Sequence, residues 1–130
     1  MKRVATNKAP GAIGPYSQAV IHNGLVYASG QIPLSPDTGE IEGADIRHQA
    51  KQVCENIQGV LEASGSCLSC VIKTTCFLAD MDDFGTFNEV YGSYFVDKPA
   101  RSCVAVKGLP RGVLCEVEVI AALCDDPSFG

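Results

Sequence analysis

The chain has 130 residues, a length typical of one domain with a single hydrophobic core. Hydrophobic residues make up 46% and charged residues 19%, a balance that excludes disordered and fibrous proteins. A formal charge of −5 disfavours a nucleic-acid partner, because nucleic-acid-binding domains cluster basic side chains. No segment is apolar for long enough to cross a membrane, and residues 1–7 lack the apolar core of a secretory signal. We therefore expect one domain over residues 1–130, no membrane partner and a cytoplasmic location.

The seven cysteines are an odd number, which argues against a secreted disulfide framework. Cys67 and Cys70 form the only C-x-x-C spacing in the sequence. A structural zinc site needs further ligands at suitable spacing, and neither His22 nor His48 supplies one. We expect reduced cysteines, no metal and no cofactor, with Cys67 and Cys70 in a turn that leads into a strand.

The Asn-Gly pair at 23–24 predicts a two-residue β-hairpin loop between strands at 17–22 and 25–29. This loop fixes the register and places Val20 opposite Tyr27. Strict alternation then gives one face small apolar residues: Ala19, Ile21, Val26, Ala28 and Gly30. The other face is mixed and carries Tyr16, Gln18, Val20, Tyr27 and Ser29.

Tyr16 and Ser29 meet at the open end of this hairpin, next to Gly30. A glycine there permits close approach of the backbone to a ligand. The residues are also compatible with an ordinary strand end, because polar residues and glycine often mark turns. Both interpretations stay open from the pattern alone.

A loop over 32–43 precedes a helix that begins after Asp45, a suitable N-cap, and ends at Gly65. Residues 71–79 are rich in β-branched side chains and predict a strand. Carboxylates at 80–83 then favour the start of a second helix. Its apolar stripe is Phe84, Phe87, Tyr91 and Phe95, and Asn88 lies on the same stripe. A buried Asn88 needs hydrogen-bond partners, in a neighbouring loop or in a ligand.

The chain continues with a strand at 101–106, a loop at 107–112 and a last strand at 113–123. If the loop joins two antiparallel strands, a register with Cys103 opposite Glu116 brings Arg101 close to both. Arginine supplies a planar fork that matches a carboxylate, and glutamate can accept a proton from water. The pair is therefore either a catalytic site or a structural ion pair.

The predicted order of elements is β-β-α-β-α-β-β. This order favours an α+β sandwich, with one sheet and two helices on one face. The uncovered face would mix Val20, Tyr27 and Ile120 with arginine, glutamate and serine side chains, Arg101 among them. Such a face is too apolar for open solvent, so we expect subunits to associate through it and to form clefts there.

Cys103 is also a candidate nucleophile, but cysteine nucleophiles need a nearby base, and the sequence places neither histidine beside it. The chain contains no phosphate-binding loop of the usual glycine-rich forms, so these routes to nucleotide binding have no support.

Three separated motifs carry a family resemblance. They are AIGPYSQA at 12–19, ASGQIP at 28–33 and PARSCV at 99–104. In this order they closely resemble the Rid (YjgF) family of enamine/imine deaminases, and the resemblance runs from about residue 6 to 123. It is closest to the RidA (2-iminobutanoate/2-iminopropanoate deaminase) branch, which keeps the arginine two residues before the cysteine and the glutamate in the last strand.

The resemblance implies a chorismate-mutase-like fold and a homotrimer whose three sheets form a central barrel, with sites between subunits. It implies that Arg101, helped by the backbone N–H of Cys103, holds the substrate carboxylate. Glu116 would activate the attacking water, and Tyr16, Ser29 and Gly30 would line the cleft from the adjoining chain. Asn88 matches a family asparagine on the second helix. Cys115 departs from the branched aliphatic residue that is more usual before the glutamate.

The implied reaction is hydrolysis of a 2-imino acid, or its enamine tautomer, to a 2-oxo acid and ammonia, without metal or cofactor. Three other functions remain as alternatives. The first is a non-catalytic or regulatory protein that binds 2-oxo acids. The second is an endoribonuclease or translation inhibitor, which the acidic charge disfavours. The third is a chaperone-like protein, for which the sequence offers no specific feature.

Overall fold

A computed structural model describes residues 1–124 of the chain; residues 125–130, the last six of the expected domain, lie outside the described part. The described elements are β1 (Lys2–Val4), β2 (Ala19–His22), β3 (Leu25–Gln31), α1 (Ile46–Ser64), β4 (Val71–Leu78), α2 (Phe84–Tyr94), β5 (Ala100–Ala105) and β6 (Cys115–Ala122). Three short 3-10 turns are η1 (Leu68–Cys70), η2 (Met81–Asp83) and η3 (Pro110–Gly112). The predicted order is confirmed, and a short strand, β1, precedes it.

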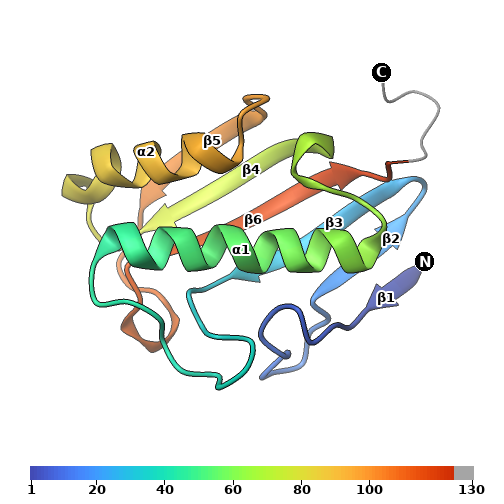
Figure 1. Cartoon of the computed structure of the whole chain (residues 1–130), viewed down its shortest axis with the longest axis horizontal. Helices are drawn as coiled ribbons and strands as arrows, with labels where there is room; N and C mark the ends of the chain where they lie inside the picture. The colour runs from blue at the N-terminus through green and yellow to red at the C-terminus, as the bar shows by residue number, and fades with distance from the viewer. Residues whose placement is uncertain (125–130) are drawn as a thin grey trace.

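The strands form one sheet in the order β1-β2-β3-β6-β4-β5, in which only the β4–β5 pair is parallel. Both helices pack against the same face of this sheet (Figure 1). The predicted α+β class, with one sheet and two helices on one face, is therefore confirmed. None of the helices in the described part of the chain is long and apolar enough to cross a membrane.

The first hairpin has the register that its turn predicts. His22 lies opposite Leu25 and Val20 opposite Tyr27. Asn23 and Gly24 both have positive φ angles, 52° and 80°, as a two-residue loop with the twist of the strands requires. The hairpin therefore needs no tertiary contact to set which side chains share a face.

Helix α1 begins and ends where its capping residues predict. The Asp45 side chain accepts a hydrogen bond from the His48 backbone N–H at 2.9 Å. Gly65 ends the helix in the left-handed conformation with a φ of 85°. The buried face of α1 packs on β3 and β6 and forms the centre of the hydrophobic core. Within it, the amide of Asn56 donates to the carbonyls of Ile32 and Leu34 and anchors the loop after β3.

The expected hairpin between the last two strands is absent, because β4 lies between β5 and β6. In β4, Cys76 pairs with Cys103 on one side and with Val117 on the other. The connection through α2 explains this arrangement, since a helix between two strands carries the chain over the sheet to a parallel neighbour. Strand β6 then fills the space between β3 and β4 and hydrogen-bonds to both.

A β-bulge also changes the predicted face of Gly30. Ala28 pairs with Val119 and Gln31 pairs with Val117, so three steps along β3 match two steps along β6. The extra residue turns Ser29 and Gly30 together toward the face without helices. The prediction that Gly30 shares a face with Ala28 is wrong, because alternation fails at a bulge.

The face without helices carries most of the mixed side chains that the sequence predicted, but Arg101 instead contacts Asn88 and Tyr91 of α2 on the other face. Val20, Tyr27 and Ile120 form a row across three strands, and Tyr27 is 45% exposed. Glu116 and Glu118 lie on the same face, since they alternate with buried residues of β6. A chain on its own therefore exposes apolar and acidic side chains together on this face.

Candidate functional site

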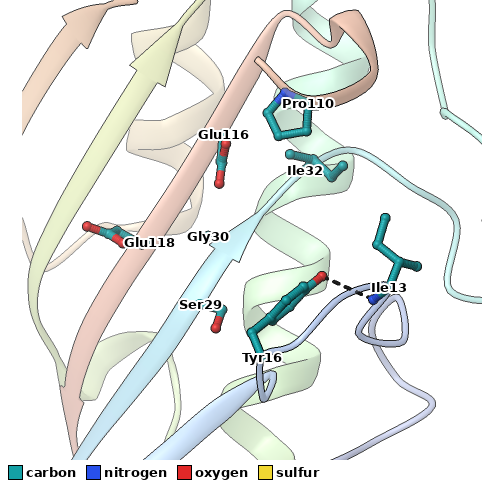
Figure 2. Close-up of a pocket in the computed structure, with 8 residues that line it drawn as sticks. All are labelled: Ile13, Tyr16, Ser29, Gly30, Ile32, Pro110, Glu116 and Glu118. Carbon is teal, nitrogen blue, oxygen red and sulfur yellow. Dashed lines mark hydrogen bonds between the residues drawn. The ribbon is translucent and has the colours of Figure 1, made fainter. Parts of the chain in front are cut away.

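The first half of the candidate site is a cavity of about 390 Å³ on the face without helices. Its lining comes from the loop before β2, the end of β3, the loop after it, η3 and the start of β6, as Figure 2 shows. The lining residues are Ile13, Tyr16, Ser29, Gly30, Ile32, Pro110, Glu116 and Glu118. The structure thus brings the predicted residues Tyr16, Ser29, Gly30 and Glu116 together.

Glu116 lies directly against the backbone of Gly30. A Cβ atom at position 30 would overlap the carboxylate and approach its carbon to 2.9 Å. Burial, with a smaller contribution from the charge of Glu118, raises the pKa of Glu116. A carboxylate with a raised pKa is a better proton acceptor, so this glutamate can serve as a general base beside the cavity.

Local hydrogen bonds fix the two polar residues across the cavity from Glu116. The Ser29 hydroxyl donates to the Ser17 carbonyl at 2.6 Å, across the open end of the hairpin. The Tyr16 hydroxyl accepts from the Ile13 backbone N–H at 3.4 Å, the contact drawn in Figure 2. Tyr16 is nevertheless 48% exposed, so its ring forms a wall of the cavity that is open to solvent.

The second half of the candidate site is a separate cavity of about 300 Å³ between α2 and β5. It is lined by Asn88, Tyr91, Gly92, Phe95, Val96, Lys98, Pro99 and Arg101. The Arg101 guanidinium donates to the Asn88 side-chain oxygen at 2.7 Å and stacks 4.8 Å from the centre of the Tyr91 ring. From the sequence, the hydrogen-bond partner of Asn88 could be a neighbouring loop or a ligand. In the structure its partner is Arg101, so Asn88 positions the guanidinium.

Arg101 has no carboxylate partner in the described part of the chain. The guanidinium has five N–H donors, and the hydrogen bond to Asn88 uses one of them. The aromatic rings of Tyr91 and Phe84 pack against it without neutralising its charge. A half-buried guanidinium with free donors beside a cavity is suited to bind an anion such as a carboxylate.

Cys103 lies two residues after Arg101 on the same face of β5 and is half-buried. Burial raises the pKa of its thiol, which disfavours the thiolate that a nucleophile needs. The neighbouring side chain across the β4–β5 pair is Cys76, and His48 instead contacts Asp45 at the start of α1. This environment makes Cys103 a weak nucleophile.

The two halves of the site do not meet within one chain. Arg101 points toward the helices, whereas Glu116 points away from them. Strand β4 lies between their strands, so β5 and β6 are about 10 Å apart. The predicted register that placed Arg101 close to Glu116 is wrong, because it rested on an antiparallel pairing that does not occur.

Four lining residues of the first cavity were not predicted: Ile13, Ile32, Pro110 and Glu118. Glu118 carried a usable signal, since it alternates with buried residues two positions after Glu116. The other three come from loops and from the short turn η3, where neither helical nor strand periodicity exists to assign a direction. Their positions depend on the packing of the loops around β3 and β6.

Similarity to known proteins identifies the family. A family model described as Endoribonuclease L-PSP matches residues 6–123. The chain belongs to this family. It is the same YjgF/Rid family that the three sequence motifs indicated, so that inference is confirmed.

Curated members of the YjgF/Rid family are similar over nearly the whole chain. A Lactococcus lactis protein named as a candidate regulator, AldR, is 56% identical over 93% of this chain and 97% of its own. A mouse protein named 2-iminobutanoate/2-iminopropanoate deaminase is 47% identical over 92% of this chain and 90% of its own. Relatives of this family thus carry both enzymatic and regulatory names.

Solved structures of the family have the same fold. Escherichia coli TdcF, crystallised with bound serine, is 45% identical with a TM-score of 0.90, over 94% of this chain and 98% of its own. The YjgF protein of E. coli is 43% identical with a TM-score of 0.90, over 94% and 98% of the two chains. The fold of this YjgF/Rid protein is therefore established by structures as well as by its sequence.

Proposed function

We propose that this YjgF/Rid protein hydrolyses reactive 2-imino acids, such as 2-iminopropanoate and 2-iminobutanoate, to 2-oxo acids and ammonia. The observation that carries the proposal is the Arg101 guanidinium, positioned by Asn88 and left with free donors beside a cavity. A planar carboxylate fits these donors. The name of the mouse relative, which is 47% identical, supports the same substrate class.

The proposal requires a second copy of the chain, because Arg101 and Glu116 face opposite sides of one sheet. We propose a homotrimer in which the faces without helices pack together and each site lies between two subunits. The exposed row with Tyr27 and the acidic side chains of β6 would then become an interface. Light scattering should give the mass of three chains, and a monomer at micromolar concentration would overturn the proposal.

In the proposed reaction, Arg101 holds the substrate carboxylate with the backbone N–H of Cys103. Glu116, from the adjoining subunit, takes a proton from a water molecule as its oxygen attacks the imine carbon. Glu116 passes this proton to the nitrogen of the resulting carbinolamine, the C–N bond breaks to release ammonia, and the hydroxyl gives up its proton to Glu116 as the C=O bond of the 2-oxo acid forms. An iminium carbon is already electrophilic, so positioning and one base are sufficient. Tyr16, Ser29 and Gly30 would line the same cleft.

The direct test is to generate 2-iminobutanoate in place with an amino-acid dehydratase and to follow its decay with and without the protein. We expect decay to accelerate in proportion to protein concentration. A rate equal to the uncatalysed one, from a folded trimer, would overturn the proposed activity. Cys103→Ala should keep most of the activity, because the proposed contact is made by the backbone.

Mixing two inactive variants tests the shared site. Arg101→Ala and Glu116→Gln subunits, unfolded together and refolded at equal concentrations, should form mixed trimers. If each site takes one residue from each of two subunits, about a quarter of the sites recover both residues. Recovery of about a quarter of wild-type activity supports the shared site, whereas no recovery from mixed trimers would overturn it.

A binding protein for 2-oxo acids is the second candidate, favoured by the regulator name of the Lactococcus lactis relative. The same arginine would then bind the ligand without turnover. Saturable 2-oxobutanoate binding, combined with an unchanged rate of imine decay, would favour this candidate. The description of the family model suggests a third candidate, cleavage of RNA. The net charge of −5 disfavours RNA binding. An assay for RNA cleavage in the same preparation would test this candidate.

A further inference from the structure

A cluster of three cysteine thiols lies at the opposite end of β6 from Glu116. Cys67 directly precedes η1, Cys70 is the last residue of η1, and Cys124 follows the end of β6. The cluster is about 20 Å from Glu116, since β6 rises about 3.3 Å per residue over the steps from Glu116 to its end at Ala122. It therefore belongs to neither half of the proposed catalytic site.

Each sulfur of the cluster is close to the other two. The Sγ–Sγ distances are 3.3 Å for Cys67 and Cys70, 2.9 Å for Cys70 and Cys124, and 3.4 Å for Cys67 and Cys124. Among residues 1–124, this is the one group of three metal-ligating side chains whose ligand atoms converge. The sequence motif at 67–70 lacked a further ligand, and the fold supplies it from a position 54 residues beyond Cys70.

Backbone and side-chain hydrogen bonds hold the two segments of the cluster together. The Cys124 N–H donates to the Gly65 carbonyl at 3.1 Å, and the Cys70 N–H donates to the Cys67 carbonyl at 3.0 Å. The Ser66 hydroxyl donates to the Ala122 carbonyl at 2.7 Å and is buried. The convergence of the thiols therefore depends on the fixed ends of α1 and β6 rather than on the sulfur contacts themselves.

The geometry fits one metal ion better than one disulfide. Tetrahedral Zn–S bonds of about 2.3 Å place the sulfurs about 3.8 Å apart, so the distances from Cys67 to the other two sulfurs need to grow by about half an ångström and the Cys70–Cys124 distance by about 0.9 Å. A disulfide would bring one pair to about 2.05 Å and would leave the third thiol without a role. Cys70 is 1% exposed whereas Cys124 is exposed, so an ion could reach the site from solvent.

We propose that Cys67, Cys70 and Cys124 bind one Zn²⁺ ion as thiolates, with the fourth position open to water or a small solute. Binding breaks three S–H bonds, releases up to three protons to the solvent and forms three Zn–S bonds without any redox change. The ion would join the turn before β4 to the end of β6. The sequence-based expectation of no metal considered only spacing, and this proposal replaces it.

The test uses the full chain without a histidine tag, reduced and freed of metal, in titrations with Zn²⁺ and with Co²⁺. We expect one Zn²⁺ per chain, proton release in weakly buffered solution and thiolate-to-cobalt charge-transfer absorption with Co²⁺. Bound Zn²⁺ should also raise the melting temperature, and a chelator should reverse this rise. A reduced, folded protein that takes up no Zn²⁺ would overturn the proposal.

Cys124→Ser is the decisive variant, because the side chain is exposed and its loss should not impair folding. It should weaken Zn²⁺ binding by at least about a hundredfold, since even changes around the ligands of a site cost ten- to a hundredfold. Cys67→Ser should do the same. Cys103→Ala is the matched control, because it removes a cysteine outside the cluster and should leave Zn²⁺ affinity unchanged.

Equal Zn²⁺ affinity in the wild type and in Cys124→Ser would overturn the proposal, and so would loss of uptake in the control. The decay of 2-iminobutanoate should be as fast with Cys124→Ser as with the wild type. The metal site and the proposed deaminase activity therefore fail or succeed independently.

Discussion

The Glu116 carboxylate occupies the space that a side chain at position 30 would fill. The bulge in β3 creates this relationship by turning Gly30 toward the face that carries Glu116. Glycine at this position therefore allows the carboxylate to lie against the strand beside the cavity, and the placement of the proposed base depends on it.

Gly30→Ala should displace the Glu116 carboxylate and lower imine turnover by at least about tenfold, since small errors in positioning are costly in catalysis. The fold should survive, because the displaced group is the end of a flexible side chain. Steady-state rates and thermal melting measure the two effects. Gly85→Ala is the matched control, since open space surrounds position 85 and alanine favours a helix by up to about 1 kcal/mol. Unchanged turnover in Gly30→Ala would show that catalysis does not depend on the position of the Glu116 carboxylate.

Glu116→Gln should reduce turnover of bound substrate by about a hundredfold or more, while 2-oxo acid binding persists. In the wild type, the rate should rise with pH as Glu116 loses its proton. The midpoint should lie above the ordinary glutamate pKa, because burial raises the pKa of Glu116. Because the pKa of Glu116 is higher in the folded than in the unfolded chain, folding favours its protonated form. The free energy of unfolding should therefore fall as pH rises through the folded-state pKa of Glu116. The glutamine variant should lose this limb of the pH–rate profile; a profile that keeps it would assign the limb to another group.

Arg101→Ala should lower activity by at least about thirtyfold. It removes the partner of the substrate carboxylate, and truncating one side of such a desolvated charge pair costs about 2–5 kcal/mol. Arg101→Lys should recover only part of the loss, since a single ammonium cannot reproduce the planar fork. Asn88→Ala should raise KM for the imino acid more than it lowers kcat, because Asn88 holds the guanidinium in position. Full activity in Arg101→Lys would show that charge alone is required there.

Cys67 should be the first cysteine to react with iodoacetamide in reduced, metal-free protein. The hydrogen bond with Ser69, and those with Cys70 and Cys124, lower the pKa of Cys67 to about 7. Burial raises the pKa of Cys76 and that of Cys115 to about 12. Labelling of Cys67 should slow as pH falls below about 7, and peptide mapping after brief alkylation measures it. Faster labelling at Cys103 would contradict this order.

Tyr91→Phe should destabilise the fold by about 1–3 kcal/mol. The Tyr91 and Thr74 hydroxyls form a buried hydrogen bond of 2.7 Å, and removing the Tyr91 hydroxyl leaves the Thr74 hydroxyl with only a weak contact of 3.8 Å to the Cys76 sulfur. Thr74→Val combined with Tyr91→Phe should recover part of the loss, because both polar groups are then gone. Denaturant unfolding of the two single variants and the double variant gives the coupling, and strictly additive losses would contradict it.

Short-range sequence features determined the register of the first hairpin, the ends of α1 and the direction of side chains along β6. The Asn-Gly loop fixed the register of β2 and β3, and Asp45 and Gly65 fixed the ends of α1. Alternation along β6 put Glu116 and Glu118 on one face and the core residues on the other. These predictions succeeded because each depends on neighbours within a few residues, where backbone conformation and side-chain periodicity suffice. The three separated motifs identified the family for a related reason, because motifs are recognised by their residues and their order along the chain, without knowledge of tertiary contacts.

The tertiary structure alone decided which distant residues meet. Pairing of β5 with β4 separated Arg101 from Glu116, and the bulge in β3 turned Gly30 toward Glu116. The ends of α1 and β6 brought Cys124 to Cys67 and Cys70. Each of these relationships depends on which strands pair, with β6 between β3 and β4 and β5 beside β4 at the edge. A sequence pattern of short range carries no information about such a choice, because many pairings satisfy the same alternation.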